Sequence, residues 1–209
     1  MKILNLYACL GGNRYKWNEV KNDIEVTAVE LDLECARLYQ ERFPNDNVIV
    51  ADAHQYLLDN YQDFDFIWSS PPCPTHSDIR RCGVQAGQYQ AMYPDMELYQ
   101  EIILLQNFAD QKTKWVIENV IPYYEPLIAP SKVLHRHNYW ANFIIINYNV
   151  NDNRIHNEIS GGNELYGFNL KDTDIKDKRK ALRNMVNPDL GLHIFKCAQD
   201  KIVTLEAFV

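Results

Sequence analysis

The sequence predicts an α/β protein with a mostly parallel sheet flanked by helices. Two observations lead to this prediction: short apolar runs recur through the first 120 residues, and helical patterns lie between them. Strands buried on both faces of a parallel sheet have nearly continuous apolar runs. Strands joined through helices lie parallel, with right-handed crossovers. Because 209 residues can bury one substantial core, we expect a single domain over residues 1–209.

The expected strands lie, in chain order, at Ile3–Ala8, Val26–Val29, Val48–Val50, Phe64–Trp68 and Trp115–Ile117. Between the second and third strands, Leu33–Phe43 places its apolar residues at helical spacing, which predicts an amphipathic helix. The same spacing predicts a second helix over Asp95–Gln111. This alternation of strands and helices is what a parallel sheet requires.

The pattern changes after Pro122. Val133–Val150 contains two apolar runs separated by a polar stretch, which predicts antiparallel strands. The following segment, Asn151–Asp177, is polar and contains several glycines, so we expect a small, loop-rich C-terminal insert. A basic helix and then an apolar helix, at about Pro188–Ala198, complete the predicted order.

The net charge of −7 is unfavourable for a protein that binds nucleic acid, because phosphate neutralisation supplies most non-specific affinity. Binding would therefore need a local basic face. Arg80–Arg81 is one candidate, and the basic residues within Lys171–Arg183 are another. Aspartates are mixed into the second cluster, so it is equally consistent with a solvated helix face.

The five cysteines include no C-x-x-C pair, so we expect no metal site. Their odd number and the absence of a signal-peptide pattern predict free thiols in a reducing cytoplasm. No apolar run reaches the roughly 18 residues of a membrane-spanning helix, so no membrane association is expected.

Glycine and acidic residues follow the first three expected strands. Tyr7–Gly12 is a glycine-rich turn after the first strand, Glu30 ends the second, and Asp52 follows the third. Each signal has a plain alternative, a tight turn or a helix cap. Open α/β sheets nevertheless bind ligands at the carboxyl ends of their strands. The sequence lacks a full G-x-G-x-x-G and a P-loop, which favours an adenosyl cofactor without a triphosphate.

The fourth expected strand leads into Pro71-Pro72-Cys73-Pro74, where prolines stiffen the backbone around one cysteine. A rigid loop at the edge of a sheet is suited to a nucleophile and is a poor place to bury a structural thiol. The fifth strand ends in Glu118-Asn119-Val120, and a buried Glu118 would have a raised pKa and could donate a proton.

Together these motifs resemble the DNA (cytosine-5) methyltransferases. Pro72-Cys73 and Glu118-Asn119-Val120 resemble that family's nucleophile and Glu-Asn-Val motifs, in the family's order. Leu182–Pro188 resembles the C-terminal motif that closes the cofactor site. The chain departs from the family at Tyr7, where phenylalanine is common, at Cys9, where glycine is common, and at Pro74, where glutamine is frequent. In the Gln-x-Arg-x-Arg segment Arg136 keeps one arginine and Asn138 replaces the other. For His135 and His137 two interpretations stay open, compensation for the lost arginine or a surface histidine with no role.

The resemblance implies a Rossmann-like class I methyltransferase fold that uses S-adenosyl-L-methionine. The residues it places at the cofactor are Tyr7, Ala8, Cys9, Leu10, Gly11, Gly12, Glu30, Leu31, Asp52, Ala53, Pro72, Asn184 and Val186. It makes Cys73 the nucleophile at cytosine C6, with Glu118 assisting at N3 and Arg136 orienting the base. The target would be a cytosine flipped out of DNA, and residues 151–180 would form a reduced target recognition region.

Two alternatives remain open. The family resemblance includes enzymes that methylate tRNA, and the acidic charge leaves room for an RNA substrate. The altered arginine segment would also suit a degenerate protein that binds DNA or a partner without catalysis. The sequence does not indicate an oligomeric state.

Overall fold

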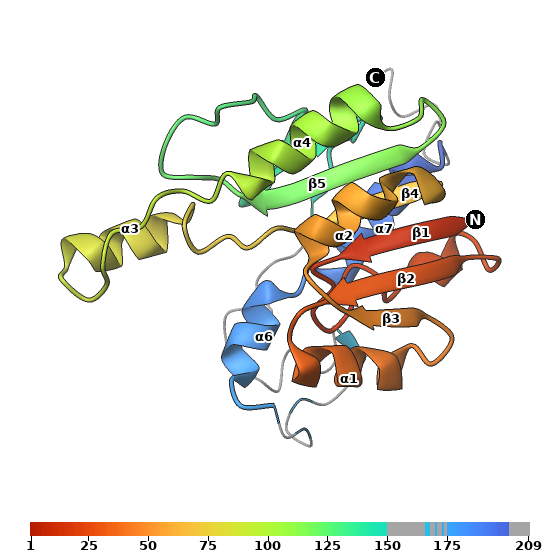
Figure 1. Cartoon of the computed structure of the whole chain (residues 1–209), viewed down its shortest axis with the longest axis horizontal. Helices are drawn as coiled ribbons and strands as arrows, with labels where there is room; N and C mark the ends of the chain where they lie inside the picture. Colours follow the sequence, from red (N-terminus) through yellow and green to blue (C-terminus); the bar gives the residue numbers. More distant parts are fainter. Residues whose placement is uncertain (150–165, 168–169, 171–172, 174, 201–209) are drawn as a thin grey trace.

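The computed structural model describes residues 1–149, 166–167, 170, 173, 175–200, and these form one layered α/β structure (Figure 1). Seven strands form a single sheet in the order β3-β2-β1-β4-β5-β7-β6. Its strands are β1 (Lys2–Leu6), β2 (Glu25–Glu30), β3 (Asn47–Val50), β4 (Phe66–Ser69), β5 (Lys114–Val120), β6 (Lys132–Leu134) and β7 (His137–Ala141). The first five are parallel, while β7 runs antiparallel to β5 and β6. The predicted mostly parallel sheet is confirmed.

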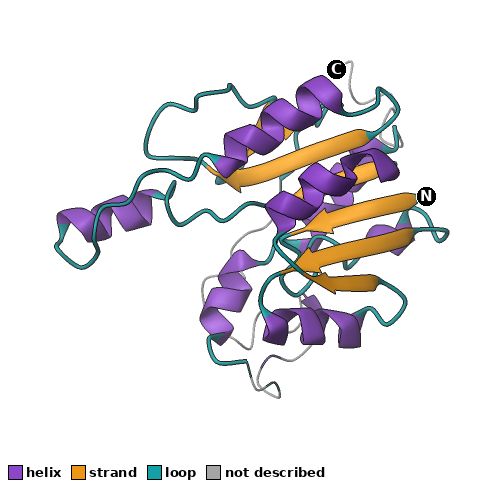
Figure 2. Cartoon of the chain, viewed as in Figure 1, coloured by secondary structure: helices purple, strands orange, loops and turns teal. Residues whose placement is uncertain are grey.

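Helices cover both faces of the sheet (Figure 2). They are α1 (Leu33–Arg42), α2 (Ala53–Asn60), α3 (Asp78–Gln85), α4 (Glu97–Phe108), α6 (Lys178–Asn184) and α7 (Pro188–Ala198), with short 3-10 turns at Trp17–Glu19 and Tyr61–Asp63. Alternate residues of β1 point to opposite faces, as the pleat requires. Ile3 packs with Phe195 of α7 on one face, whereas Leu4 packs with Leu57 of α2 and Ile102 of α4 on the other. The sheet is therefore buried on both sides.

The helices begin where polar side chains satisfy their first N–H groups. Asp32 accepts hydrogen bonds from Glu34 N and Cys35 N at the start of α1. Asp52 accepts one from Gln55 N at the start of α2. Such caps supply acceptors for N–H groups that have no partner inside the helix. The capping alternative considered for Asp52 is thus what the structure shows.

The sequence prediction misses one helix and overextends one strand. Helix α3 was not expected; it buries only its glycine, Gly83, while its apolar residue Ile79 is 83% exposed. The second apolar run continues past Ala141, but residues 142–149 form no strand. Phe143 and Ile145 are buried there against the α7 side of the core. The apolar pattern at Phe143 and Ile145 therefore reflects burial in the core, although these residues pair with no strand. The basic and apolar helices after residue 177 are confirmed as α6 and α7.

The expected insert, residues 151–180, lies mostly outside the described residues. Within it, Tyr166, Leu170 and Ile175 are buried and share a cluster with Cys9 and Leu10 of the turn after β1. These side chains therefore belong to the core around that turn. The expectation that residues 151–180 read the target remains a prediction.

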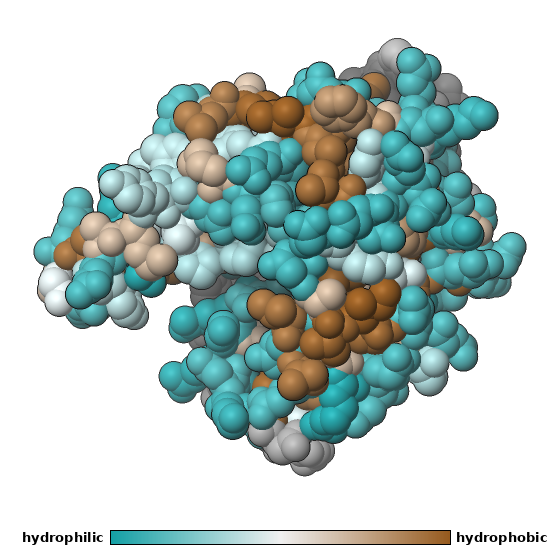
Figure 3. All heavy atoms as spheres, viewed as in Figure 1, coloured by the Kyte–Doolittle hydropathy of each residue, from teal (hydrophilic) through white to brown (hydrophobic). Residues whose placement is uncertain are grey.

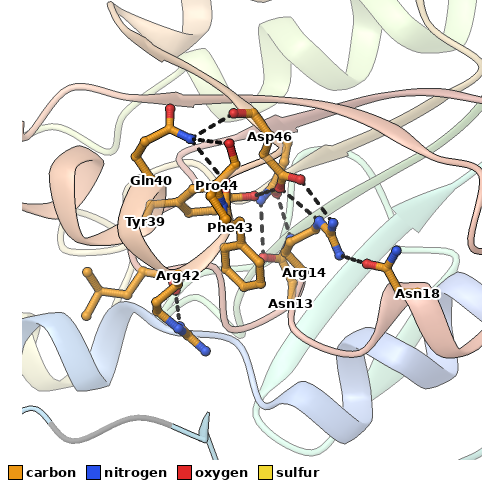
Figure 4. Close-up of polar contacts among 11 residues, drawn as sticks. Asn13, Arg14, Asn18, Tyr39, Gln40, Arg42, Phe43, Pro44 and Asp46 are labelled. Carbon is orange, nitrogen blue, oxygen red and sulfur yellow. Dashed lines mark hydrogen bonds and ion pairs between the residues drawn. The ribbon is translucent and has the colours of Figure 1, made fainter.

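A buried ion pair anchors the chain just after the glycine-rich turn (Figure 4). Arg14 Nε and Nη2 donate to the two carboxylate oxygens of Asp46 at 2.9 and 3.0 Å, and both residues are about 5% exposed. Tyr39 Oη donates to the same carboxylate at 3.0 Å, while Arg14 Nη1 donates to Asn18 Oδ1 at 2.6 Å. The pair joins the turn after β1 to the loop between α1 and β3.

Breaking this pair should strongly destabilise the fold. We expect Asp46→Ala to lower the free energy of unfolding by about 3–5 kcal/mol, because it leaves the Arg14 guanidinium buried without a carboxylate. The matched control is Glu41→Ala, which breaks the exposed Arg37–Glu41 pair on α1 and should cost about 0.5 kcal/mol or less. Urea unfolding followed by circular dichroism measures both. Equal losses for the two variants would contradict the role given to Asp46.

Candidate active site

The turn after β1 has an unusual backbone. Tyr7, Cys9 and Gly11 have φ values of 54°, 47° and 72°, and the first two are non-glycine residues in the left-handed region. Cys9 stands where the resembled family commonly has glycine, which adopts this conformation without strain. A Cβ on Gly12 would lie 2.3 Å from the carbonyl oxygen of Val186, so the turn and the segment after α6 are in direct contact.

Glu30, at the end of β2, holds this turn. Its Oε2 accepts a hydrogen bond from Cys9 N at 2.8 Å, and its Oε1 accepts one from Asp32 N at 2.9 Å. Each carboxylate oxygen can accept a further bond from a ligand. Leu31 beside it is 68% exposed. The carboxylate of Glu30 therefore fixes the turn, and exposed Leu31 lies beside it at the same edge of the sheet.

An apolar surface adjoins a carboxylate at the ends of β2 and β3. Leu31, Leu33 and Val50 are all exposed, and Figure 3 shows apolar side chains gathered over β3 and α1. Asp52 lies two residues after the end of β3 and is exposed, whereas its neighbour Ala53 is buried. Exposed apolar side chains beside a hydrogen-bond acceptor suit a flat aromatic ring that carries an amino group. The predicted adenine and ribose contacts thus lie at one edge, and their residue types fit an adenosyl group.

Cys73 lies in a fixed loop after β4. The carbonyl of Pro71 accepts a hydrogen bond from Asn119 Nδ2 at 2.9 Å, and the carbonyl of Cys73 accepts bonds from His76 N and Ser77 N at 3.0 and 3.1 Å. Asn119 of the Glu-Asn-Val motif therefore fixes the loop that presents the thiol. The thiol is half-buried, and burial raises its pKa, with a smaller contribution from the charge of Glu118.

Glu118 is buried in β5 and faces a histidine. Its Oε1 lies 3.4 Å from Nε2 of His137, the first residue of β7. Tyr139 is opposite Glu118 in the antiparallel register, and burial together with the charge of Glu118 raises the pKa of its phenol. The sequence left the role of His137 open, and the structure places it against the candidate acid. His135 lies exposed in the turn before it.

Arg136 is exposed in the β6–β7 turn, and its carbonyl oxygen accepts a hydrogen bond from Ile121 N at 3.1 Å. The turn therefore adjoins the end of β5, where Glu118 lies. Asn138, which replaces the second arginine of the resembled family, is 2% exposed and pairs with Asn119 in the sheet. An arginine at position 138 would have to bury its guanidinium at this point. In the C-terminal motif, Asn184 is exposed and Val186 is half-buried against the turn.

Sequence reasoning missed Glu101, a fully buried carboxylate on α4. It accepts hydrogen bonds from Tyr7 Oη at 2.7 Å and from Ser69 Oγ at 2.6 Å, and His54 Nδ1 lies 3.1 Å away. Hydrogen bonding to Glu101 raises the pKa of His54. The only local signal was an acidic residue on the apolar face of a helix, flanked by Leu98 and Leu105.

The segment between β4 and α4 forms an arm that carries α3 away from the sheet, on the side of the parallel strands' carboxyl ends (Figure 1). Arg80 lies over the ring of Tyr89, with 5.2 Å from its guanidinium carbon to the ring centroid. Arg81 lies 5.8 Å from the ring centroid of Tyr123 and bonds Asp78 at 2.7 Å. The arm therefore presents two cations close to the candidate nucleophile loop.

Within the described residues, no three histidine, cysteine, aspartate or glutamate side chains are grouped so that they could hold a metal ion. No helix in that part of the chain is long and apolar enough to span a bilayer. The cysteines at 9, 35, 73, 82 and 197 are all free thiols.

Several solved structures are similar to this chain. A mutant of DNMT2 from Spodoptera frugiperda is 26% identical over 57% of this chain, with a TM-score of 0.39. A putative DNA modification methyltransferase encoded within an Escherichia coli prophage is 18% identical over 60% of this chain, with a TM-score of 0.37. The SAM-dependent methyltransferase from Agrobacterium tumefaciens is 16% identical over 59% of this chain and 40% of its own, with a TM-score of 0.41. The chain covers 35% and 33% of the first two, about a third of their length.

No curated protein sequence matches the chain. The model of the C-5 cytosine-specific DNA methylases, however, matches residues 1–125, which is more than half of it. That range includes the turn after β1, the Cys73 loop and the Glu118 motif. The strand order β3-β2-β1-β4-β5-β7-β6 gives the mostly parallel α/β sheet that the sequence predicts. The chain belongs to the C-5 cytosine-specific DNA methylase family.

Proposed function

We propose that this chain transfers a methyl group from S-adenosylmethionine to C5 of a cytosine in DNA, with Cys73 as the covalent nucleophile. The supporting observation is that Asn119, next to Glu118 in β5, donates a hydrogen bond at 2.9 Å to the carbonyl of Pro71 in the Cys73 loop, so both motifs lie at one edge of the sheet. The turn after β1 lies at the same edge and has left-handed residues held by Glu30. A nucleophile, an acid and an adenosyl site thus converge, which is what methylation of a pyrimidine carbon needs.

Cytosine C5 is a weak nucleophile, so the reaction needs covalent activation. The Cys73 sulfur forms a bond to C6 as its thiol proton passes to water, while Glu118 donates a hydrogen bond or proton to N3. The electron pair displaced from the C5–C6 bond makes C5 nucleophilic. The bound cofactor supplies an electrophilic methyl group. Loss of the C5 proton to a base then expels the Cys73 thiolate and restores the C5–C6 double bond.

Burial affects the thiol of this pair. The raised pKa of Cys73 keeps the sulfur protonated at neutral pH in the free protein. The charge of Glu118 adds to this shift. His137 Nε2 lies 3.4 Å from Glu118 Oε1, so the imidazole contacts the same carboxylate.

The α3 arm supports nucleic acid as the substrate. The target base must leave its stack to reach a half-buried thiol, so a mobile or protruding element has to hold the strand. Arg80 and Arg81 supply positive charge on a chain whose net charge is −7. Tyr93 on the same arm is 94% exposed, and an exposed aromatic ring can stack on a base. Arg136 would orient the flipped base.

The covalent step is tested by trapping. We expect a DNA duplex that carries 5-fluorocytosine to form a denaturation-resistant adduct with the protein and S-adenosylmethionine, because fluorine at C5 cannot leave as a cation. Cys73→Ala should abolish the adduct, whereas Cys197→Ser, in α7 and away from the site, should retain it. Denaturing gel electrophoresis measures the yield. An adduct with an RNA oligonucleotide but none with DNA would reassign the substrate, and no adduct with either would contradict the mechanism.

The pairing of Cys73 with Glu118 is tested by the pH dependence of alkylation. The thiolate reacts with iodoacetamide, and the raised pKa means that the rate should increase only above the range of an ordinary cysteine. Glu118→Gln removes the negative charge, so half-maximal alkylation should shift to lower pH. Mass spectrometry of the Cys73 peptide measures the rate, with exposed Cys82 as an internal reference. An unchanged profile in Glu118→Gln would contradict the coupling.

The arm is tested by salt dependence. We expect Arg80→Gln/Arg81→Gln to weaken DNA binding and to lower the slope of log K against log salt by about 1–2, if each arginine neutralises one phosphate. Lys112→Gln, an exposed cation at the opposite edge of the sheet, is the matched control. Fluorescence anisotropy with a labelled duplex measures both. If the arm variant kept the wild-type slope of log K against log salt, Arg80 and Arg81 would not contact DNA phosphates.

A further inference from the structure

We propose that Glu101 is a positioning residue that locks the cofactor turn to the nucleophile loop. The inference rests on the proposed function, because it takes Tyr7–Gly12 as the donor turn and Cys73 as the nucleophile. Neither motif contains Glu101, which lies on α4, on the face of the sheet opposite α7. Its carboxylate is nevertheless the point at which the two motifs meet.

The contacts are divided between the two sides. Glu101 Oε1 accepts the hydrogen bond of Tyr7 Oη at 2.7 Å, and Tyr7 is the first residue of the donor turn. Glu101 Oε2 accepts the bond of Ser69 Oγ at 2.6 Å, and Ser69 ends β4 four residues before Cys73. Each oxygen therefore restrains one loop. Because the carboxylate is rigid, its two oxygens fix the separation of the two hydroxyl groups.

The hydrogen bond from Tyr7 to Glu101 holds a strained backbone in place. Tyr7 has a φ of 54°, a conformation that costs a non-glycine residue about 1–2 kcal/mol and persists only where the surroundings hold it. Its phenol is buried next to Glu101, and burial with that charge raises its pKa, so it remains a hydrogen-bond donor. Losing the bond should let the backbone of the donor turn relax.

The cost of burying Glu101 supports a role beyond packing. The residue is 0% exposed, and an isolated buried carboxylate is strongly disfavoured. Here three groups satisfy it: the two hydroxyls and His54 Nδ1 at 3.1 Å, whose Nε2 contacts Gln100 Oε1 at 3.1 Å. A leucine at this position of α4 would fill the space without that cost, but it would leave Tyr7 and Ser69 without their acceptor.

The experiment separates the two sides with readouts that do not need a nucleic acid. Tyr7→Phe should raise the Kd for S-adenosylmethionine about 3–10-fold, as expected for one lost hydrogen bond, while the alkylation rate of Cys73 stays near wild type. Ser69→Ala should raise the alkylation rate of Cys73 about 3–10-fold, because the loop is released, with a smaller change in Kd. Glu101→Gln keeps the shape but only one acceptor oxygen, so it should change both. Calorimetry measures the Kd, and mass spectrometry measures the alkylation rate.

The control is Thr113→Val, which removes a buried hydroxyl that donates to Phe64 O at 2.9 Å, at the opposite end of β5. It should lower Tm without changing either readout. If Glu101→Gln also lowers Tm but leaves the Kd and the alkylation rate unchanged, Glu101 is structural and the proposal fails. A wild-type protein that binds the cofactor but forms no adduct with any nucleic acid would contradict the proposed function. The Kd and the alkylation rate would still test the role of Glu101 in that case. Wild-type protein that binds no cofactor would overturn the donor side of the lock.

Discussion

The reversal of the winding direction between β1 and β4 determines where every candidate residue lies. The chain runs outward from β1 through β2 to β3, then returns to place β4 on the other side of β1. Loops that leave two adjacent parallel strands in opposite directions open a crevice at their carboxyl ends. The donor turn follows β1, and the loop of Cys73 follows β4. Their meeting therefore follows from the strand order before any side chain is considered.

Buried charges then hold this edge in one arrangement. Arg14 and Asp46 anchor the chain just after the donor turn on the side of α1, whereas Glu101 anchors its first residue on the side of α4. Charges in a weakly polarisable interior tolerate little displacement, because an unmatched charge there is costly. Apolar packing alone tolerates small shifts more readily. The donor turn is thus restrained from both faces of the sheet by interactions of high directional precision.

The sequence predicted the strands and motifs that depend on local pattern. It did not predict contacts between side chains that are distant in the chain. The five parallel strands were found because burial on both faces makes their sequences apolar. The motifs at the strand ends were found because parallel strands bring their carboxyl ends to one edge. The partners of Glu101 and Arg14 were not, since a buried hydrogen bond or ion pair between residues distant in sequence has no local signature. Helix α3 was missed because it is only eight residues long and buries no residue other than Gly83 against the rest of the protein.

The contact between the donor turn and α6 has a consequence for folding. Cys9 Sγ lies 3.7 Å from the carbonyl oxygen of Ala181, and the two residues are 172 positions apart in sequence. Contacts of such separation close large loops, and proteins rich in them fold slowly. During synthesis the first half of the chain leaves the ribosome before Ala181 does. The donor turn therefore cannot contact α6 until the later part of the chain has been made. The cofactor would then bind only after α6 has packed against the donor turn. It would stabilise only the molecules in which this contact has formed.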